Sequence, residues 1–144
     1  MGRTRNASEA TIPSALHQLK QMIDGAQSEI DFGRSHSSGT LAVSGAVRAV
    51  DLICDVELGE HSTAANHRDA IDLLARIISA ESLVEDFSLC QSHKSEFNYH
   101  ASDLAIEHAG EVLDAARRLA TVAVQRVVVK GWFPSTLNPR DYDF

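Results

Sequence analysis

The window Ser92–Ser102, with the sequence SHKSEFNYHAS, offers more to chemistry than any other part of the chain. Lys94 supplies a positive charge for a phosphate, and the His100 imidazole can exchange protons near neutral pH. Tyr99 can stack on a base or donate a hydrogen bond. On an ideal helix Lys94 and His100 point about 120° apart, so they converge only if the helix breaks before His100 or if two subunits meet there. The alternative is a solvated helix end with a few capping groups.

The seven histidines raise the question of a metal site. None shows the spacing H-E-x-x-H, and neither cysteine belongs to a zinc-binding pair. His61 and His67 lie at an expected helix start, where a surface or capping role is typical. The sequence also lacks a glycine-rich phosphate loop and a G-x-S-x-G nucleophile motif. We therefore predict no metal ligands and no cofactor.

A second group of charges lies on the last expected helix and consists of Arg117, Arg118, Arg126 and Lys130. Cations near the C-terminus of a helix complement its dipole, and this is the interpretation we prefer. A phosphate-binding strip is the alternative.

Composition narrows the function classes. The chain has 144 residues and a formal net charge of −7, which suits one domain and excludes a broadly basic nucleic-acid coat. Two cysteines are too few for a disulfide framework. Charged residues interrupt the longest apolar stretch, Leu41–Leu58, so it is not a membrane span. Because Met1–Ala10 is polar and does not resemble a secretory signal, we expect a cytoplasmic protein without membrane contact.

Only three prolines occur, and apolar residues recur in steps of three and four, which predicts an all-α protein. The first helix is expected from Pro13 to just before Gly33. The second is expected to begin near Ser38 or Thr40 and to end at Gly59 in a left-handed cap.

The later helices are expected to follow closely. Capping groups at His61–Thr63 would begin the third helix, and Ser79–Ser82 is a plausible joint to the fourth. Ser102 or Asp103 would cap the last helix, which runs to about Val128 and is stopped by Gly131. The β-branched run Val127–Val129 could fray into an extended segment. We predict an up-and-down bundle of four to five antiparallel helices over residues 12–130. A polar N-terminal arm, residues 1–11, precedes it, and an aromatic-rich C-terminal tail, residues 131–144, follows it.

The order of these features resembles the HEPN domain family of small helical bundles. The similarity covers about residues 12–128. It is carried by Gly39–Ile78, with its alanine-rich helix ending near a glycine and a histidine at Asn66-His67, and by Lys94–Ala120. The resemblance implies a homodimer that binds a nucleotide or RNA, in many members as a metal-independent endoribonuclease of the toxin–antitoxin type with a nucleotidyltransferase-like partner. The family motif is an arginine followed, after a short spacer, by a histidine. Lys94 and His100 stand at those positions here, with lysine in place of the arginine.

Three functions are compatible with this pattern. The first is a non-catalytic, HEPN-like dimeric bundle that acts as a nucleotide-binding or protein-interaction module, with the nucleotide contacted by Lys94, Asn98, Tyr99 and His67. Lysine lacks the planar fork with which arginine grips a phosphate, which favours this interpretation. The second is an endoribonuclease in which His100 is the general base and Lys94 stabilises the phosphate charge. The third is a purely structural interaction bundle whose tail joins a partner.

Overall fold

The structure is a computed structural model that describes residues 4–6, 8–63, 68–77, 79–99 and 104–144. The α-helices are α1 (Ile12–Asp31), α2 (Ser35–Leu58), α3 (Arg68–Ala75), α4 (Glu81–Ser92), α5 (Lys94–Tyr99) and α6 (Leu104–Lys130). Two 3-10 turns, η1 (Glu9–Thr11) and η2 (Pro139–Tyr142), and two short strands, β1 (Thr4–Asn6) and β2 (Glu60–Ser62), complete the described elements. The all-α expectation is thereby confirmed in its coarse form.

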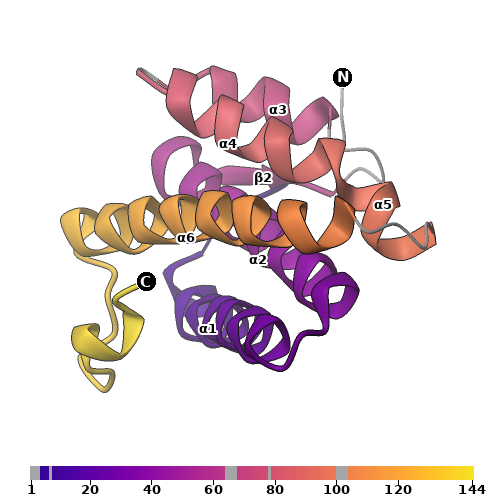
Figure 1. Cartoon of the computed structure of the whole chain (residues 1–144). Helices are drawn as coiled ribbons and strands as arrows, with labels where there is room; N and C mark the ends of the chain where they lie inside the picture. The colour runs from indigo at the N-terminus through magenta and orange to yellow at the C-terminus, as the bar shows by residue number, and fades with distance from the viewer. Residues whose placement is uncertain (1–3, 7, 64–67, 78, 100–103) are drawn as a thin grey trace.

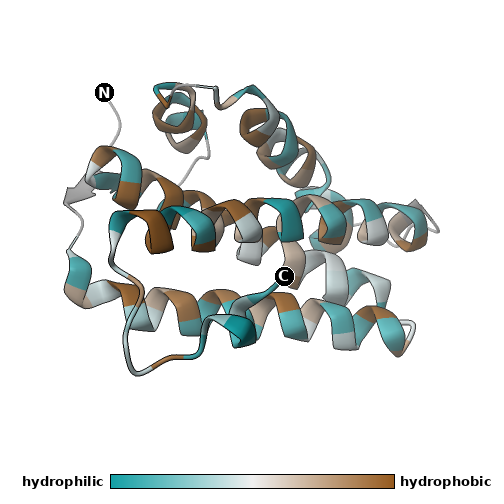
Figure 2. Ribbon diagram, turned by 90° about the vertical axis from the view of Figure 1, so that its left-hand side faces the viewer, coloured by the Kyte–Doolittle hydropathy of each residue, from teal (hydrophilic) through white to brown (hydrophobic). Residues whose placement is uncertain are grey.

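The long helices α2 and α6 form the centre of the molecule. Helix α1 packs on α2, α4 packs on α6, and α3 lies beside α4 on the outer side (Figure 1). Hydrophobic and hydrophilic residues alternate along the long helices, as amphipathic helices require (Figure 2). The buried faces of the two central helices are rich in small side chains, which lets their backbones approach closely; among them are Ala42, Ala46 and Ala49 on α2 and Ala109, Ala116 and Ala120 on α6.

Glycines end two of the helices as predicted. Gly59, the residue after α2, has a φ of 75° and donates its N–H to the carbonyl of Asp55. Gly131 has a φ of 81° and follows α6. The predicted fraying of Val127–Val129 is wrong, because the side chain of Val127 is completely buried in the core and the N–H of Trp132 donates to its carbonyl at 3.0 Å. Both interactions hold the last turn helical.

The segment before α3 also differs from the prediction. His61 and Ser62 do not cap a helix; they lie in β2, which pairs antiparallel with β1 so that Arg5 faces His61. Part of the N-terminal arm is therefore a strand. Helix α3 is described from Arg68 to Ala75, and it is separate from α4, with Ser79 at a φ of 62° between them. The predicted joint is confirmed at Ser79 and Ala80, whereas Glu81 and Ser82 already belong to α4.

The aromatic tail packs back on the bundle. Tyr142 is 7% exposed and meets the ring of Phe133 edge-on, with the ring centroids 5.8 Å apart. Arg117 of α6 donates to the carbonyl oxygen of Phe144 at 3.4 Å. Within the described residues no helix combines the length and apolar character needed to span a bilayer.

Candidate functional site

A polar stripe runs along α2. Its members are separated by three or four residues, so they lie on one face of the helix; they are Thr40, Ser44, Arg48, Asp51 and Asp55. The stripe runs from the exposed Thr40 to the buried Asp55. We refer to these five residues as the α2 stripe.

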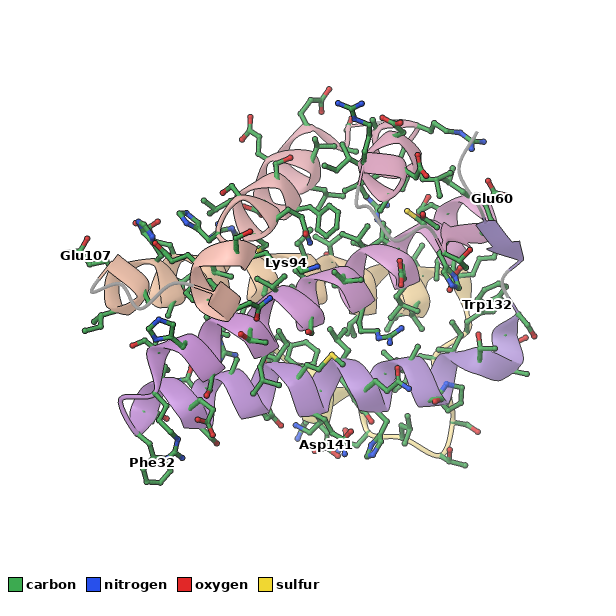
Figure 3. The ribbon with its side chains drawn as sticks, turned by 90° about the vertical axis from the view of Figure 1, so that its right-hand side faces the viewer. Phe32, Glu60, Lys94, Glu107, Trp132 and Asp141 are labelled. Carbon is green, nitrogen blue, oxygen red and sulfur yellow. The ribbon has the colours of Figure 1, made fainter. Side chains whose placement is uncertain are left out.

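Helix α5 lies against the first half of this stripe. The ring of Phe97 is 4% exposed and occupies the space beside Gly39, where any Cβ atom would overlap it. At the next residue of each helix, the hydroxyl of Thr40 donates to Oδ1 of Asn98 at 3.0 Å. These contacts hold α5 on α2 and place Lys94, its first residue, between the two helices (Figure 3).

Lys94 and Arg48 line the same pocket. The cavity has a volume of about 260 Å³ and lies between α1, α2 and α5; its lining residues are Met22, Val43, Ser44, Val47, Arg48 and Lys94. Three of them form an apolar wall, Ser44 contributes a hydroxyl, and none of these six described residues carries a negative charge. We call this cavity the Arg48–Lys94 pocket, and its chemistry is suited to an anion.

Other arginines are engaged in ion pairs. Arg118 contacts the carboxylate of Asp86 at 2.9 Å beside a hollow of about 510 Å³, and Arg126 lies 3.6 Å from Glu57 beside another of about 510 Å³. These two hollows thus combine cations with carboxylates. The cations of α6 serve to tie this helix to its neighbours.

The second half of the α2 stripe carries a carboxylate–histidine cluster. Asp55 is 7% exposed, and its Oδ1 lies 2.7 Å from Nδ1 of His61 in β2. Burial raises the pKa of Asp55, and the hydrogen bond and charge of His61 oppose this. Burial also raises the pKa of Asp51 to about 6, against the opposing charges of His61 and Arg48. Asp51 therefore links this cluster electrostatically to the cation of the Arg48–Lys94 pocket.

A third polar group lies where α4 ends. His93, the residue after α4, stacks with its ring centroid 4.0 Å from that of His108 on α6. Oε2 of Glu96 lies 2.7 Å from Nδ1 of His108. Ligand atoms of His93, His108 and Glu111 all lie within 4.8 Å of one another. Two imidazoles and two carboxylates thus meet at the junction of three helices.

The predicted site residues are placed as follows. Lys94 lines the pocket, and Asn98 lies at the neighbouring end of the α2 stripe. Tyr99 is the last residue of α5. His67 and His100 lie outside the described residues, so the convergence of Lys94 with His100 stays a prediction.

Several residues of these clusters were not expected from the sequence. Arg48 and Ser44 are four residues apart, so the sequence already places them on one helix face. The sequence analysis took only the apolar face of this helix into account. His93, His108 and Glu111 lie on elements that meet only in the folded chain, so no spacing motif connects them.

Comparisons of the chain with protein-family models, curated proteins and solved structures found no match. What the chain can do therefore follows from the side chains that its fold brings together.

Proposed function

We propose that the chain is a nucleotide-binding module with a dimeric, HEPN-like bundle, and that the Arg48–Lys94 pocket recognises the phosphate. The observation that carries this proposal is the position of two cations on one small cavity whose described lining residues include no carboxylate. On a chain with a net charge of −7, a local concentration of positive charge is what an anionic ligand would require.

The chemistry of the pocket favours a phosphate over a simple halide. A guanidinium can donate two parallel hydrogen bonds to phosphate oxygens, and the lysine ammonium acts as a compact point charge. The Ser44 hydroxyl is a further donor. The volume of about 260 Å³ is at the lower end for ligand pockets, so it suits a phosphate with part of a sugar rather than a whole nucleotide.

The rest of the nucleotide would lie along the first half of the α2 stripe. Asn98 is exposed at that end, and its amide can donate to a base or ribose while its Oδ1 accepts from Thr40. Tyr99 follows it directly in the chain and is proposed to contribute stacking.

Calorimetric titration with a nucleoside monophosphate and with inorganic phosphate tests this function. We expect Lys94→Gln and Arg48→Gln each to weaken nucleotide binding by about tenfold or more, because each removes a charge-assisted hydrogen bond. Arg126→Gln is the matched control, since Arg126 is a cation paired with Glu57 outside the pocket. Equal binding by the wild type and both pocket variants would refute the proposal, and no binding at all would favour the purely structural bundle.

An endoribonuclease is the second candidate. The observation that favours it is the Asp55–His61 pair, because a buried carboxylate on one ring nitrogen orients an imidazole for proton transfer. The charges of His61 and Arg48 both lower the pKa of the nearby Asp51 carboxyl. His100, expected from the sequence as the general base, is the alternative imidazole.

Incubation with single-stranded and transfer RNA in the presence of a chelator separates these candidates. Cleavage that is lost in His100→Ala or in His61→Ala would identify the base and establish an enzyme. If the wild type leaves the RNA intact, and Lys94→Arg does not induce cleavage, the binding module is the better description.

A further inference from the structure

Two elements bring a compact set of metal-ligating side chains together outside the Arg48–Lys94 pocket. His93 caps the C-terminal end of α4, and His108 and Glu111 lie three residues apart on α6, which places them on the same face of that helix. The ligand atoms of these three residues lie within 4.8 Å of one another.

Glu96 of α5 orients this group. Its side chain is 16% exposed, and its Oε2 lies 2.7 Å from Nδ1 of His108 and 3.7 Å from Nδ1 of His93. A carboxylate on Nδ1 fixes the tautomer of an imidazole and leaves Nε2 as the free ligand atom. The relation between Glu96 and His108 is thus the carboxylate–histidine arrangement that supports metal ligands in proteins.

We propose that His93, His108 and Glu111 bind a divalent transition-metal cation of the Zn²⁺ class, with Glu96 as the positioning residue for His108. Imidazole nitrogens with one carboxylate oxygen suit Zn²⁺ and its neighbours rather than Mg²⁺ or Ca²⁺. Three protein ligands leave one position of a tetrahedral ion for water or an anion.

To accept the ion, the three ligand atoms have to move closer together and the stacked rings of His93 and His108 have to turn toward a common point. Ligand distances near 2.1 Å place tetrahedral ligand atoms about 3.4 Å apart, so separations of up to 4.8 Å have to close by up to about 1.4 Å. Glu111 is exposed, and rotation of its side chain can supply this movement. The two thiols are poor competitors for the ion, since burial raises the pKa of Cys54 and of Cys90 to about 12.

The test uses the full chain after removal of metal with a chelator. We expect it to bind one Zn²⁺ in competition with a chromogenic chelator, and to give with Co²⁺ the visible absorption bands of a site with low coordination number. Glu111→Gln should weaken Zn²⁺ binding by about tenfold or more and remove the rise in melting temperature that Zn²⁺ gives the wild type. This variant changes an exposed side chain and so leaves the core intact.

Two further variants and two controls locate the ion. His108→Gln should abolish the Co²⁺ bands, and Glu96→Gln should lower the affinity by about tenfold without changing the stoichiometry. Glu107→Gln and His17→Gln, which change exposed groups outside the cluster, are the matched controls and should bind as the wild type does. Absence of stoichiometric binding would overturn the proposal, and so would binding that persists in Glu111→Gln and His108→Gln but is lost in His61→Gln.

Discussion

At the scale of single residues, Asp51 is a half-buried carboxyl group with an elevated pKa. Burial within the α2 stripe raises the pKa of its carboxyl from 3.8 to about 6, although Arg48 and His61 both favour the charged form. The folded protein therefore holds the proton more tightly than the unfolded chain does. The stability that this provides is complete below pH 3.8 and is lost as the pH rises through about 6.

Replacing this carboxylate by a neutral amide should therefore stabilise the protein in the alkaline range. We expect Asp51→Asn to raise the free energy of unfolding by about 1–3 kcal/mol at about pH 8, and to have little effect at about pH 4. Urea unfolding across this range measures the effect, with the exposed Asp72→Asn of α3 as control. A variant that is less stable than the wild type at about pH 8 would show that the charged carboxylate is needed in the fold.

Single residues were predictable from the sequence where their chemistry was local. Lys94 stood out because polar groups surround it in the chain, and the structure places it on a pocket. Arg48 did not stand out, because it lines the pocket only when α5 packs on α2. That packing depends on the contact between Phe97 and Gly39, which are far apart in the sequence.

At the scale of elements, α5 decides whether the pocket exists. This helix has six residues, too few to be stable alone, so it depends on its packing against α2. The ring of Phe97 fills the space that the missing side chain of Gly39 leaves. Glycine is therefore required at position 39 for the close approach of α5 to α2.

A methyl group at Gly39 should separate the two helices. We expect Gly39→Ala to lower the free energy of unfolding by about 1–3 kcal/mol and to weaken phosphate binding, because Lys94 moves with α5. Gly110→Ala is the matched control on α6: its Cβ would meet no atom within 4 Å, so this change should stabilise the helix by about 0.5–1 kcal/mol. Thermal unfolding of both variants checks the pair, and a neutral Gly39→Ala would contradict the packing described.

Helices and their ends were predictable where the residues of a single helix determine them. The helix ends at Gly59 and Gly131 follow from local backbone geometry and were predicted correctly. The β2 strand was not predicted, because it forms only by pairing with β1, which lies near the N-terminus and far from β2 in the sequence. The helical state of Val127–Val129 was missed for a similar reason: burial of Val127 in the core outweighs its β-branched preference.

At the scale of the whole molecule, the proposed dimer has a surface that could support it. Phe32 is 73% exposed and Ile106 is 67% exposed. Phe32 projects at the same end of the molecule as Glu107, the neighbour of Ile106 in α6 (Figure 3). We propose that these two exposed apolar side chains contribute to the contact with a second copy of the chain.

Light scattering tests the association. We expect a species of twice the chain mass of 15.6 kDa, and a shift toward the single chain when Phe32 and Ile106 are both replaced by serine. A wild type that stays at 15.6 kDa at the highest concentrations would contradict the proposed dimer. The proposed nucleotide pocket would then be a property of a single chain.

The net charge of the molecule makes the position of the proposed phosphate site the decisive question. The Arg48–Lys94 pocket must attract the anion against an overall charge of −7, so binding should weaken as salt screens the local cations.

A titration of the ¹⁵N-labelled protein with inorganic phosphate, followed by amide chemical shifts, locates the anion most directly. The predicted result is a saturable set of shifts confined to α2 and α5 around Ser44, Val47, Arg48 and Lys94. Shifts centred instead on Arg118 and Arg126, or no saturable shifts at all, would contradict the assignment of the pocket as the phosphate site.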